Sequence, residues 1–507
     1  MEYKKPQNSE IVAANVFASD AGRIETNVNA SVNLSKHLST GVLLHASDEF
    51  TSLDDNGDGF MDMPMVKQYN FINRWYYKKD KYNSQVFVRA LSESRMGGQM
   101  EATPQNGKYH IGIDTEHYEF FLKNGYLFNE ATGTSVGLLI SGSLHNQDAM
   151  YGLKHYDGHQ GNLYANLIYQ TNFGPIHKLS TGASFNFDNF DESLHVYQHV
   201  ILKSKEYVPG VFAEYTLNFH DKLVALVGLR ADYNSVYGAF VTPRLHLKYN
   251  IADYLLLRGS AGKGYRSPNV LAENTFLLAS NRSLNIASNL KMESAWNYGL
   301  SAHTFIPLIG KELGITGEWY STHFDQQVVV DMDSNPHGVT FSNLMGKSFA
   351  NSFQLEVNME IAKGLTATIA HRIIDARTTL GGVLREKPLT SRSKSLFTTS
   401  YQTPLKKWQL DFTVQHNGGG RLPDPDASKP LWEKEFKPYT VMNAQITKYF
   451  RIWSVYLGSE NLTNYVQKNP IVDVQQPFSS DFDASMVWGP MHGRKVYIGL
   501  RWGLDRT

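Results

Sequence analysis

The chain has 507 residues, no cysteine, and equal numbers of basic (Lys plus Arg, 48) and acidic (Asp plus Glu, 48) residues, so its formal net charge is zero. The balanced charge argues neither for a nucleic-acid partner nor for a strongly charged pore, and no nucleic-acid partner is expected. The absence of cysteine excludes a disulfide scaffold and thiolate zinc sites. No apolar run approaches the roughly 18 residues of a transmembrane helix, and no Pro/Ser-rich or charged tract divides the chain.

Apolar and polar residues alternate along most of the chain, and this pattern predicts about 22 β-strands. The alternation is clear over residues 136–144, 223–233 and 496–502. Each of these segments is about as long as a tilted strand needs to cross the hydrocarbon layer of a membrane. A single segment of this kind also fits a soluble β-sandwich, but its recurrence along the whole chain favours a membrane barrel.

The connections between these strands alternate in length. Short turns are expected at residues 35–39, 79–82, 220–222, 252–254, 309–312, 362–364 and 406–408. Long loops are expected at residues 49–64, 149–159, 193–206, 270–293, 331–347, 418–437 and 466–493. We therefore predict an all-β fold, a transmembrane antiparallel β-barrel of about 22 strands with short periplasmic turns and long extracellular loops.

The first long loop, residues 49–64, contains oxygen side chains at alternate positions followed by a glycine, as at the start of an EF-hand calcium loop. The predicted calcium ligands are Asp54, Asn56, Asp58, the carbonyl oxygen of Phe60, and Asp62. Met65 stands where an EF-hand has its glutamate, so the motif is incomplete. We expect a weak structural calcium site; the alternative is a loop rich in Asp and Gly because these residues favour turns.

Two further groups of polar residues are candidate sites. The histidines His145, His155 and His159 cluster with Tyr151 and Tyr156 around one predicted loop, and we interpret them as ordinary loop residues. Charged side chains on or beside positions that face the lumen are expected to pack inside the barrel, or to set ion preference if the pore is open. These are Arg230, Asp232, Lys263, Arg266 and Glu318.

No catalytic residues and no catalytic cofactor are predicted. Residues 133–137 match Gly-x-Ser-x-Gly, but a nucleophile elbow needs a strand before the motif and a helix after it, and here a turn precedes it and an alternating strand follows. In the last long loop, Phe478, Phe482 and Trp488 lie among acidic residues and are candidate ligand contacts, but this composition does not identify a ligand.

Four segments resemble, in order and spacing, signatures of the TonB-dependent outer-membrane receptor family. These signatures are an aromatic-Arg-Ala-Pro block that opens a long loop, the return strand after it, the penultimate strand and the closing strand. The corresponding segments are residues 262–269, 293–299, 460–465 and 494–502. Their family-motif residues are Tyr265, Arg266, Pro268, Asn461 and Trp502.

The resemblance implies a division of the chain into a plug-to-barrel junction, residues 1–10, and a receptor β-barrel domain, residues 11–507. Residues 1–6 contain no apolar core or cleavage site of a signal peptide. We expect the signal peptide, the plug domain and the TonB box of the family upstream of residue 1. Coupling to the TonB complex is expected only if these segments exist there.

The resemblance also implies a receptor and transporter rather than an enzyme, in contact with lipids of the outer membrane of a Gram-negative bacterium. Its expected ligand is a small, scarce metal chelate, either a ferric siderophore or a cobalamin-like molecule. Residues 270–293 contain no histidine, which argues against haem. Two alternatives stay open, a passive porin-like channel and a surface β-rich adhesin. Ligand-binding residues are not predicted.

Overall fold

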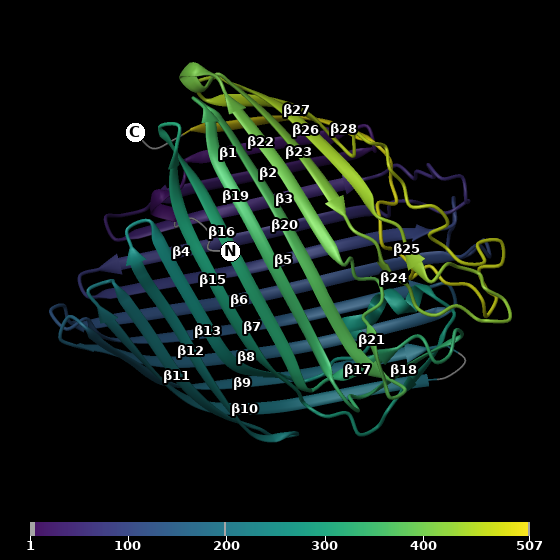
Figure 1. Ribbon diagram of the computed structural model, residues 1–507, viewed down its shortest axis with the longest axis horizontal. Helices are drawn as coiled ribbons and strands as arrows, with labels where there is room; N and C mark the ends of the chain where they lie inside the picture. The colour runs from purple at the N-terminus through teal and green to yellow at the C-terminus, as the bar shows by residue number, and fades with distance from the viewer. Residues whose placement is uncertain (1–5, 197–198, 505–507) are drawn as a thin grey trace.

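The computed structural model describes residues 6–196 and 199–504, and these form a closed antiparallel barrel of 22 strands (Figure 1). The barrel strands are β1 (Val12–Ser19), β2 (Arg23–Asn33), β3 (Leu38–Glu49), β4 (Met65–Lys79), β5 (Tyr82–Gly98), β6 (His110–Asn129), β7 (Thr134–Tyr151), β8 (Lys154–Phe173), β9 (His177–His195), β10 (His199–Phe219), β11 (Leu223–Asn234), β12 (Gly238–Ala252), β13 (Leu255–Arg266), β15 (Glu293–Leu308), β16 (Lys311–Gln326), β19 (Ser348–Ala362), β20 (Leu365–Leu380), β22 (Ser393–Gln402), β23 (Trp408–Asn417), β26 (Tyr439–Tyr449), β27 (Trp453–Glu460) and β28 (Lys495–Leu504). β1 also pairs with β28, with Ala14 opposite Trp502, which closes the sheet.

The remaining elements lie in the connections. β17 (Val328–Asp331) pairs antiparallel and β14 (Ser283–Ile286) pairs parallel with β18 (Gly338–Asn343), so segments from two different loops share one small sheet. β21 (Val383–Glu386) pairs antiparallel with the end of β20, and β24 (Gly420–Arg421) pairs with β25 (Glu435–Phe436). The 3-10 segments are η1 (Pro6–Asn8), η2 (Ala272–Ala279) and η3 (Pro404–Lys406).

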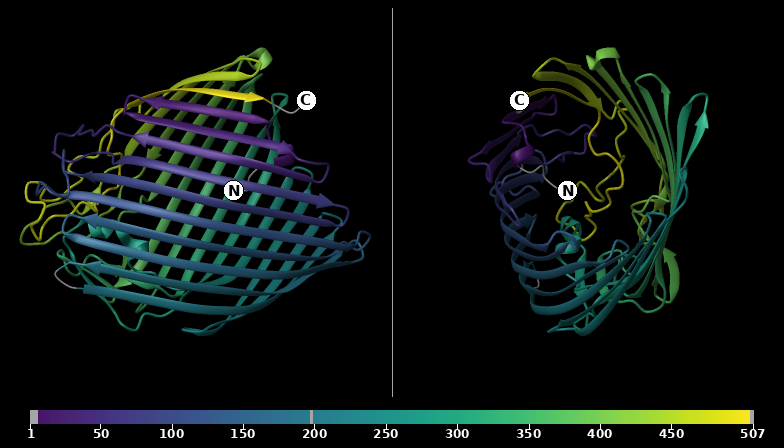
Figure 2. Two further views of the ribbon diagram at one scale, coloured as in Figure 1. Left: turned by 180° about the vertical axis from the view of Figure 1, so that it is seen from behind. Right: turned by 90° about the vertical axis from the view of Figure 1, so that its left-hand side faces the viewer.

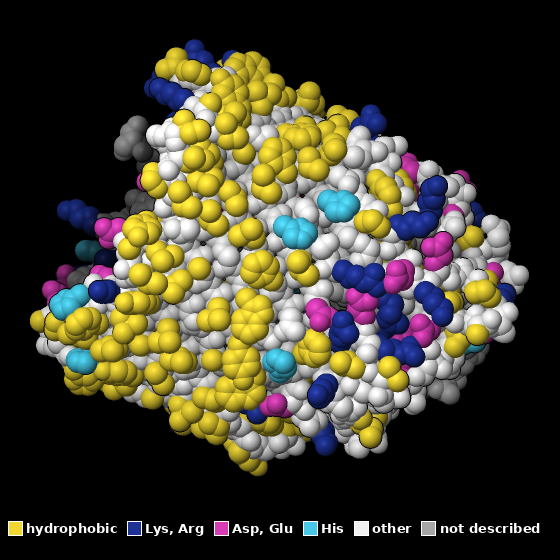
Figure 3. Space-filling view, viewed as in Figure 1, with side chains coloured by type: hydrophobic (Ala, Val, Ile, Leu, Met, Phe, Trp, Pro, Cys, Tyr) yellow, Lys and Arg dark blue, Asp and Glu magenta, His cyan; other side chains and the backbone are white. Residues whose placement is uncertain are grey.

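The strand alternation places apolar side chains on the outside of the barrel. On β11, Val227, Leu229 and Tyr233 are exposed, whereas Asp232 is buried on the opposite, inner face. Figure 3 shows hydrophobic side chains spread over the strands and charged side chains gathered over the loops at one end. No helix among residues 6–196 and 199–504 is long and apolar enough to span a membrane.

The two ends of the barrel differ in their connections, as predicted from the sequence. At one end, two-residue hairpins join neighbouring strands, as at Ile309 and Gly310, whose φ angles of 54° and 71° are those of a type I′ turn. At the opposite end are long connections such as residues 50–64, 267–292 and 461–494. We call these the short-turn end and the long-loop end. The last described residues of β28 lie at the short-turn end (Figure 2, left).

The predictions of long loops at residues 149–159 and 193–206 are wrong. β7 runs to Tyr151 and β8 begins at Lys154, and β9 runs to His195 before β10 begins at His199. The predicted loop residues His155 and His159 therefore lie on β8, within paired strands. These strands extend well beyond the apolar, lipid-facing part of the barrel. Beyond it their outer side chains are polar, and their sequence therefore resembles that of a loop.

The closing strands are joined by tyrosine rings that lie over glycines on the neighbouring strand. Tyr456 of β27 faces Gly499 of β28, and Tyr497 of β28 faces Gly458 of β27. The Tyr456 hydroxyl also donates a hydrogen bond of 3.0 Å to Asn15 Oδ1 on β1, so this side chain spans β28 and links β27 to the first strand. The glycines are required here because a side chain would occupy the space of the ring.

Replacing Gly499 by valine is expected to weaken the barrel closure. The new side chain would overlap the Tyr456 ring, and forcing extra atoms into such a contact costs about 1–3 kcal/mol. The measurement is the temperature at which the folded band on an SDS gel converts to the unfolded band. Gly503→Val is the matched control, since nothing lies within 4 Å of a Cβ at that position. Equal conversion temperatures for the two variants would contradict the packing argument.

Candidate functional site

The connections at the long-loop end pack on one another and form an ordered structure, which we call the cap. Seen from the short-turn end, its loops cross part of the barrel opening (Figure 2, right). The cap comprises residues 50–64, 99–109, 267–292, 327–347, 381–392, 418–438 and 461–494. It has its own buried apolar residues. Leu271 and Leu278 pack on Tyr151 and Tyr156 at the strand tips, and Leu277 packs on Phe341. Burial of these side chains fixes the backbone of otherwise irregular segments.

A third apolar cluster joins loops from opposite ends of the sequence. Phe60, Tyr109 and Phe482 are buried together, with the Phe60 and Phe482 ring centroids 5.8 Å apart and those of Tyr109 and Phe482 4.7 Å apart. Phe60 was predicted to contribute a carbonyl ligand to calcium. Its side chain anchors residues 50–64 to residues 461–494, and the role of its carbonyl oxygen stays a prediction.

A buried ion pair lies at the centre of the cap. Arg282 Nε is 2.8 Å from Asp483 Oδ2, and the two side chains are only 2% and 4% exposed. Arg282 Nη1 donates to the carbonyl oxygen of Met332 at 3.1 Å, and the guanidinium lies 5.7 Å from the centre of the Trp432 ring. Arg282 thus contacts three different loops. Nearby, the buried amine of Lys154 donates to the carbonyl oxygen of Ser280.

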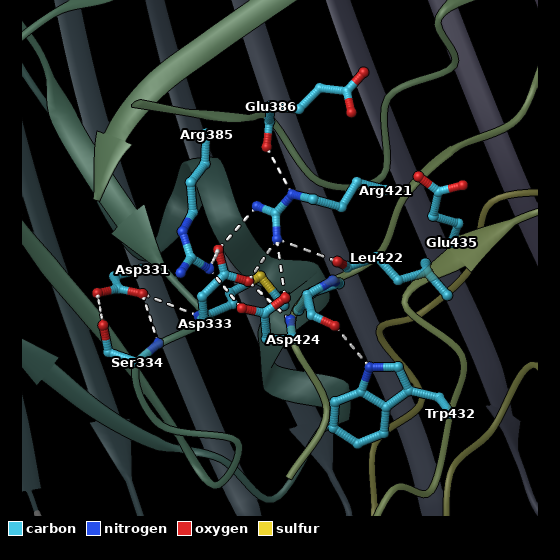
Figure 4. Close-up of polar contacts among 12 residues, drawn as sticks. Asp331, Asp333, Ser334, Arg385, Glu386, Arg421, Leu422, Asp424, Trp432 and Glu435 are labelled. Carbon is cyan, nitrogen blue, oxygen red and sulfur yellow. Dashed lines mark hydrogen bonds and ion pairs between the residues drawn. The ribbon is translucent and has the colours of Figure 1, made fainter. Parts of the chain in front are cut away.

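A second charged cluster surrounds Asp333 (Figure 4). Its two carboxylate oxygens accept hydrogen bonds of 2.9 and 2.8 Å from Nη1 and Nη2 of Arg421, a bidentate pair. The Asp333 carboxylate also accepts the Asp424 backbone N–H at 2.9 Å, and Arg385 ion-pairs with Asp424 at 2.5 Å. Bidentate Arg–carboxylate geometry is among the strongest polar contacts in proteins. The cluster therefore ties residues 327–347 to β21 and to residues 418–438.

The predicted calcium loop is ordered by its own backbone. Asp54 accepts hydrogen bonds from the N–H groups of Gly57, Asp58 and Gly59 at 2.8, 3.1 and 2.9 Å. Asp58 accepts from the N–H of Phe60 at 2.8 Å and from the amide of Asn56 at 3.0 Å. The sharp turn uses glycines with positive φ, as the sequence predicts. Calcium binding here stays a prediction.

Asp62 contacts Asp55, which in turn contacts the last long loop. Its Oδ2 accepts the Asp55 N–H at 2.5 Å, and the Asp55 carboxylate lies 2.9 Å from Nδ1 of His492 in the last long loop. Burial, together with the nearby charges of Asp55 and Asp54, raises the pKa of the Asp62 carboxyl to about 6. Asp55 and His492 were not among the predicted ligands.

Several residues of the family motifs lie where two long loops, residues 267–292 and 461–494, join the barrel strands. Asn461 has a φ of 51° and its amide donates to the carbonyl oxygens of Tyr465 and His492 at 2.8 and 3.1 Å, so it shapes both ends of residues 461–494. Tyr265 stacks on Phe240 with ring centroids 4.7 Å apart. The remaining motif residues are Arg266, which ion-pairs with Glu293 and Glu273, Pro268, which is half-buried, and Trp502, which is exposed on β28.

The predicted charged residues of the lumen mostly form pairs. Arg230 ion-pairs with buried Asp232 at 2.6 Å. Glu318 lines a recess with Arg258 and His303. Lys263 pairs with Asp325 at 2.8 Å.

The three aromatic residues predicted as ligand contacts differ in exposure, and Trp488 is half-buried. Phe482 is wholly buried, Trp488 stacks on Phe436 with ring centroids 5.0 Å apart, and Phe478 is exposed. Among the predicted histidines, His155 lies 3.0 Å from Asp148, and the rings of His145 and His117 lie 5.6 Å apart. These groups are not brought together into one site.

Sequence reasoning missed the charged residues that hold the cap together. Arg282 and Asp483 are 201 positions apart, and Arg421 and Asp333 are 88 apart, so no local spacing links either pair. The one local signal was the apolar run at residues 276–279, which is unusual for an exposed loop and lies just before Arg282.

Comparisons with known proteins agree with this architecture. No curated protein matches the chain. Among solved structures, the copper transporter OprC has a TM-score of 0.77 at 12% identity, covering 98% of this chain and 80% of that chain. A mutant of the ferric enterobactin receptor PfeA from Pseudomonas aeruginosa has a TM-score of 0.73 at 13% identity, covering 98% and 81%. The siderophore receptor PirA from Acinetobacter baumannii has a TM-score of 0.73 at 13% identity, covering 99% and 81%.

At these identities the solved structures show a shared fold. The family itself is shown by the sequence, because the family model described as "TonB dependent receptor-like, beta-barrel" matches residues 39–462. This match covers most of the barrel wall and all but the last of the long loops. The chain therefore belongs to the TonB-dependent receptor-like β-barrel family.

Proposed function

We propose that this chain is the barrel of an outer-membrane receptor that takes up a scarce metal chelate. The observation that carries the proposal is the cap: loops from across the sequence are packed, with buried ion pairs, at one end of a wide barrel. An ordered, preorganised surface of this kind suits capture of a specific solute, since little conformational freedom is lost on binding. A passive pore needs no such surface.

We infer the class of ligand from the names of the structural neighbours. The structural neighbours include receptors described by their names as binding ferric enterobactin and ferripyoverdine, and one described as a copper transporter. We infer a ferric siderophore or a related metal chelate for this chain; a cobalamin-like ligand is the second candidate within the same mechanism. The barrel contacts outer-membrane lipids through its apolar outer face. If a plug domain and a TonB box precede this barrel, TonB acting on the plug drives import. The chain carries out no chemical reaction on its ligand.

Ligand binding is tested with the purified chain in detergent. Trp432 and Trp488 lie in the cap, so tryptophan fluorescence reports on events there. Titration with a ferric catecholate, a ferric hydroxamate and cobalamin is expected to give saturable quenching by one of them, with a Kd of about 1 μM or below. Unsaturable responses to all three, together with a large permanent conductance in planar bilayers, would favour the porin-like alternative.

Calcium is expected to stiffen residues 50–64 if Asp54, Asn56 and Asp58 bind it. The rate at which a protease cleaves this loop should then fall several-fold in about 1 mM calcium, the range that fills weak extracellular sites. Asp54→Asn keeps an oxygen acceptor for the Gly57 N–H but removes a charge, so its cleavage rate should not respond to calcium. Identical cleavage of the unmodified chain with calcium and with a chelator would refute the prediction.

A further inference from the structure

Two cap loops, residues 50–64 and 461–494, meet at three side chains that all carry metal-ligating atoms. Asp55, Asp62 and His492 each place one such atom within 4.8 Å of the others. His492 Nδ1 is 2.9 Å from Asp55 Oδ2, and Asp62 lies beside them because it accepts the Asp55 N–H. The loops are more than four hundred residues apart in the sequence, so the cluster is created by the fold.

The imidazole of His492 is the part of this cluster that points to a missing ligand. Its side chain is 12% exposed, both ring nitrogens are buried, and neither makes a hydrogen bond within residues 6–196 and 199–504. Nδ1 lies 2.9 Å from Asp55 Oδ2 without making a hydrogen bond to it, so it is the nitrogen positioned to ligate an ion together with the carboxylates. A buried polar atom without a hydrogen-bond partner is costly, and coordination of an ion would offset that cost.

The backbone around the cluster is held in place independently of any ion. The N–H of Gly493 donates to Asp55 Oδ2 at 2.9 Å, and the amide of Asn461 donates to the carbonyl oxygen of His492 at 3.1 Å. On the other loop, Phe60 is fixed in the apolar cluster with Phe482. The three ligating side chains therefore project from a preformed scaffold, which lowers the cost of binding an ion.

We propose that Asp55, Asp62 and His492 bind a divalent transition-metal ion of the Zn²⁺ type and so lock residues 50–64 to residues 461–494. One imidazole nitrogen and two carboxylates suit Zn²⁺, Ni²⁺ or Cu²⁺, whereas Ca²⁺ takes oxygen ligands only. In tetrahedral Zn²⁺ sites with bonds of about 2.0–2.1 Å, ligand atoms lie about 3.4 Å apart, within the spacing available here. Water completes the shell. This ion fixes the cap and is separate from the transported chelate.

The full chain in detergent is first stripped of metal with a chelator. It is then titrated with ZnCl₂, and separately with CaCl₂, and binding is measured by calorimetry. One Zn²⁺ is expected to bind per chain, and bound Zn²⁺ should protect both loops from a protease. His492→Ala and the nearly isosteric Asp62→Asn should each weaken Zn²⁺ binding at least about tenfold, the loss expected for a perturbed metal site. Calcium binding should not change in His492→Ala.

His155→Ala is the matched control, because it removes an imidazole that also contacts two carboxylates, Asp148 and Asp157, but on an exposed strand face. It should leave the tight Zn²⁺ site intact. The heat-dependent shift of the folded band on SDS gels shows that each variant retains its barrel. Zn²⁺ binding that is absent in the unmodified chain, or equally strong in folded His492→Ala, overturns the proposal. Loss of binding in His155→Ala instead would also overturn it.

Discussion

Replacing Arg282 by alanine is expected to release residues 461–494 from the cap while the barrel stays folded. The substitution leaves the Asp483 carboxylate buried without its partner, and also removes the contact with the carbonyl oxygen of Met332. Removing one partner of a buried ion pair costs about 3–5 kcal/mol of stability. Because the cap is stabilised separately from the wall, this loss should appear as local opening rather than as global unfolding.

Hydrogen exchange of residues 479–486 is the direct measurement for Arg282→Ala. A loss of this size should speed exchange there more than about 100-fold, and affinity for the chelate should fall with it. Arg377→Ala is the control, since Arg377 ion-pairs with Asp375 at 2.7 Å but both side chains are largely exposed, 49% and 43%. Unchanged exchange in Arg282→Ala would contradict the role given to this pair.

Replacing Asp333 by alanine is expected to detach residues 418–438 from residues 327–347. Asp333 is 4% exposed and accepts hydrogen bonds from both terminal nitrogens of Arg421 and from the N–H of Asp424. Its removal therefore takes the bidentate carboxylate partner from a largely buried guanidinium and leaves a backbone donor unpaired. The expected loss of local stability is about 3–5 kcal/mol. Arg385 would lose a nearby negative charge as well.

Limited proteolysis between residues 422 and 434 checks the Asp333→Ala result, with cleavage expected to become much faster. Glu435→Ala provides the comparison, because Glu435 belongs to the same charged region and ion-pairs with Arg392 at 2.6 Å, yet its side chain is 60% exposed. Equal cleavage rates in the two variants would show that the bidentate pair does not hold these loops together.

The barrel wall was predictable because its constraints are local. Alternation on segments such as residues 223–233 follows from one lipid-facing and one interior face, and short turns such as Ile309–Gly310 carry their own signal. The loop predictions over residues 149–159 and 193–206 failed where the strands extend beyond the apolar, lipid-facing part of the barrel. Beyond it, an exposed polar face on a paired strand resembles a loop, and only the register with neighbouring strands distinguishes the two.

The cap was not predictable, because its contacts are between residues distant in sequence. Asp54, Asn56 and Asp58 were recognised from their spacing, and the structure places them on one tight turn. His492 lies in a different loop and Asp55 is an unremarkable member of an acidic run, so their meeting with Asp62 requires the folded chain. Arg282 and Asp333 were missed for the same reason. Family motifs helped only where one residue shapes the backbone, as Asn461 does.

The division between wall and cap has a functional consequence. The wall is held by continuous backbone pairing around the barrel, including β1 with β28, so it tolerates changes in the loops. The cap depends on a few buried charges and small apolar clusters, which places its local stability well below that of the wall. A ligand bound by the cap can therefore alter loop packing without disturbing the barrel in the membrane.

Uptake of radioactive iron by cells that carry or lack the gene for this receptor, supplied with defined ferric chelates, measures the proposed function directly. We expect deletion of the gene to abolish accumulation from at least one ferric siderophore, and restoration of the gene to recover it. Recovery should fail with Arg282→Ala, although the barrel is present in the membrane. Unchanged uptake of every chelate after deletion, with lower permeability to small unrelated solutes, would contradict a receptor and indicate a passive channel.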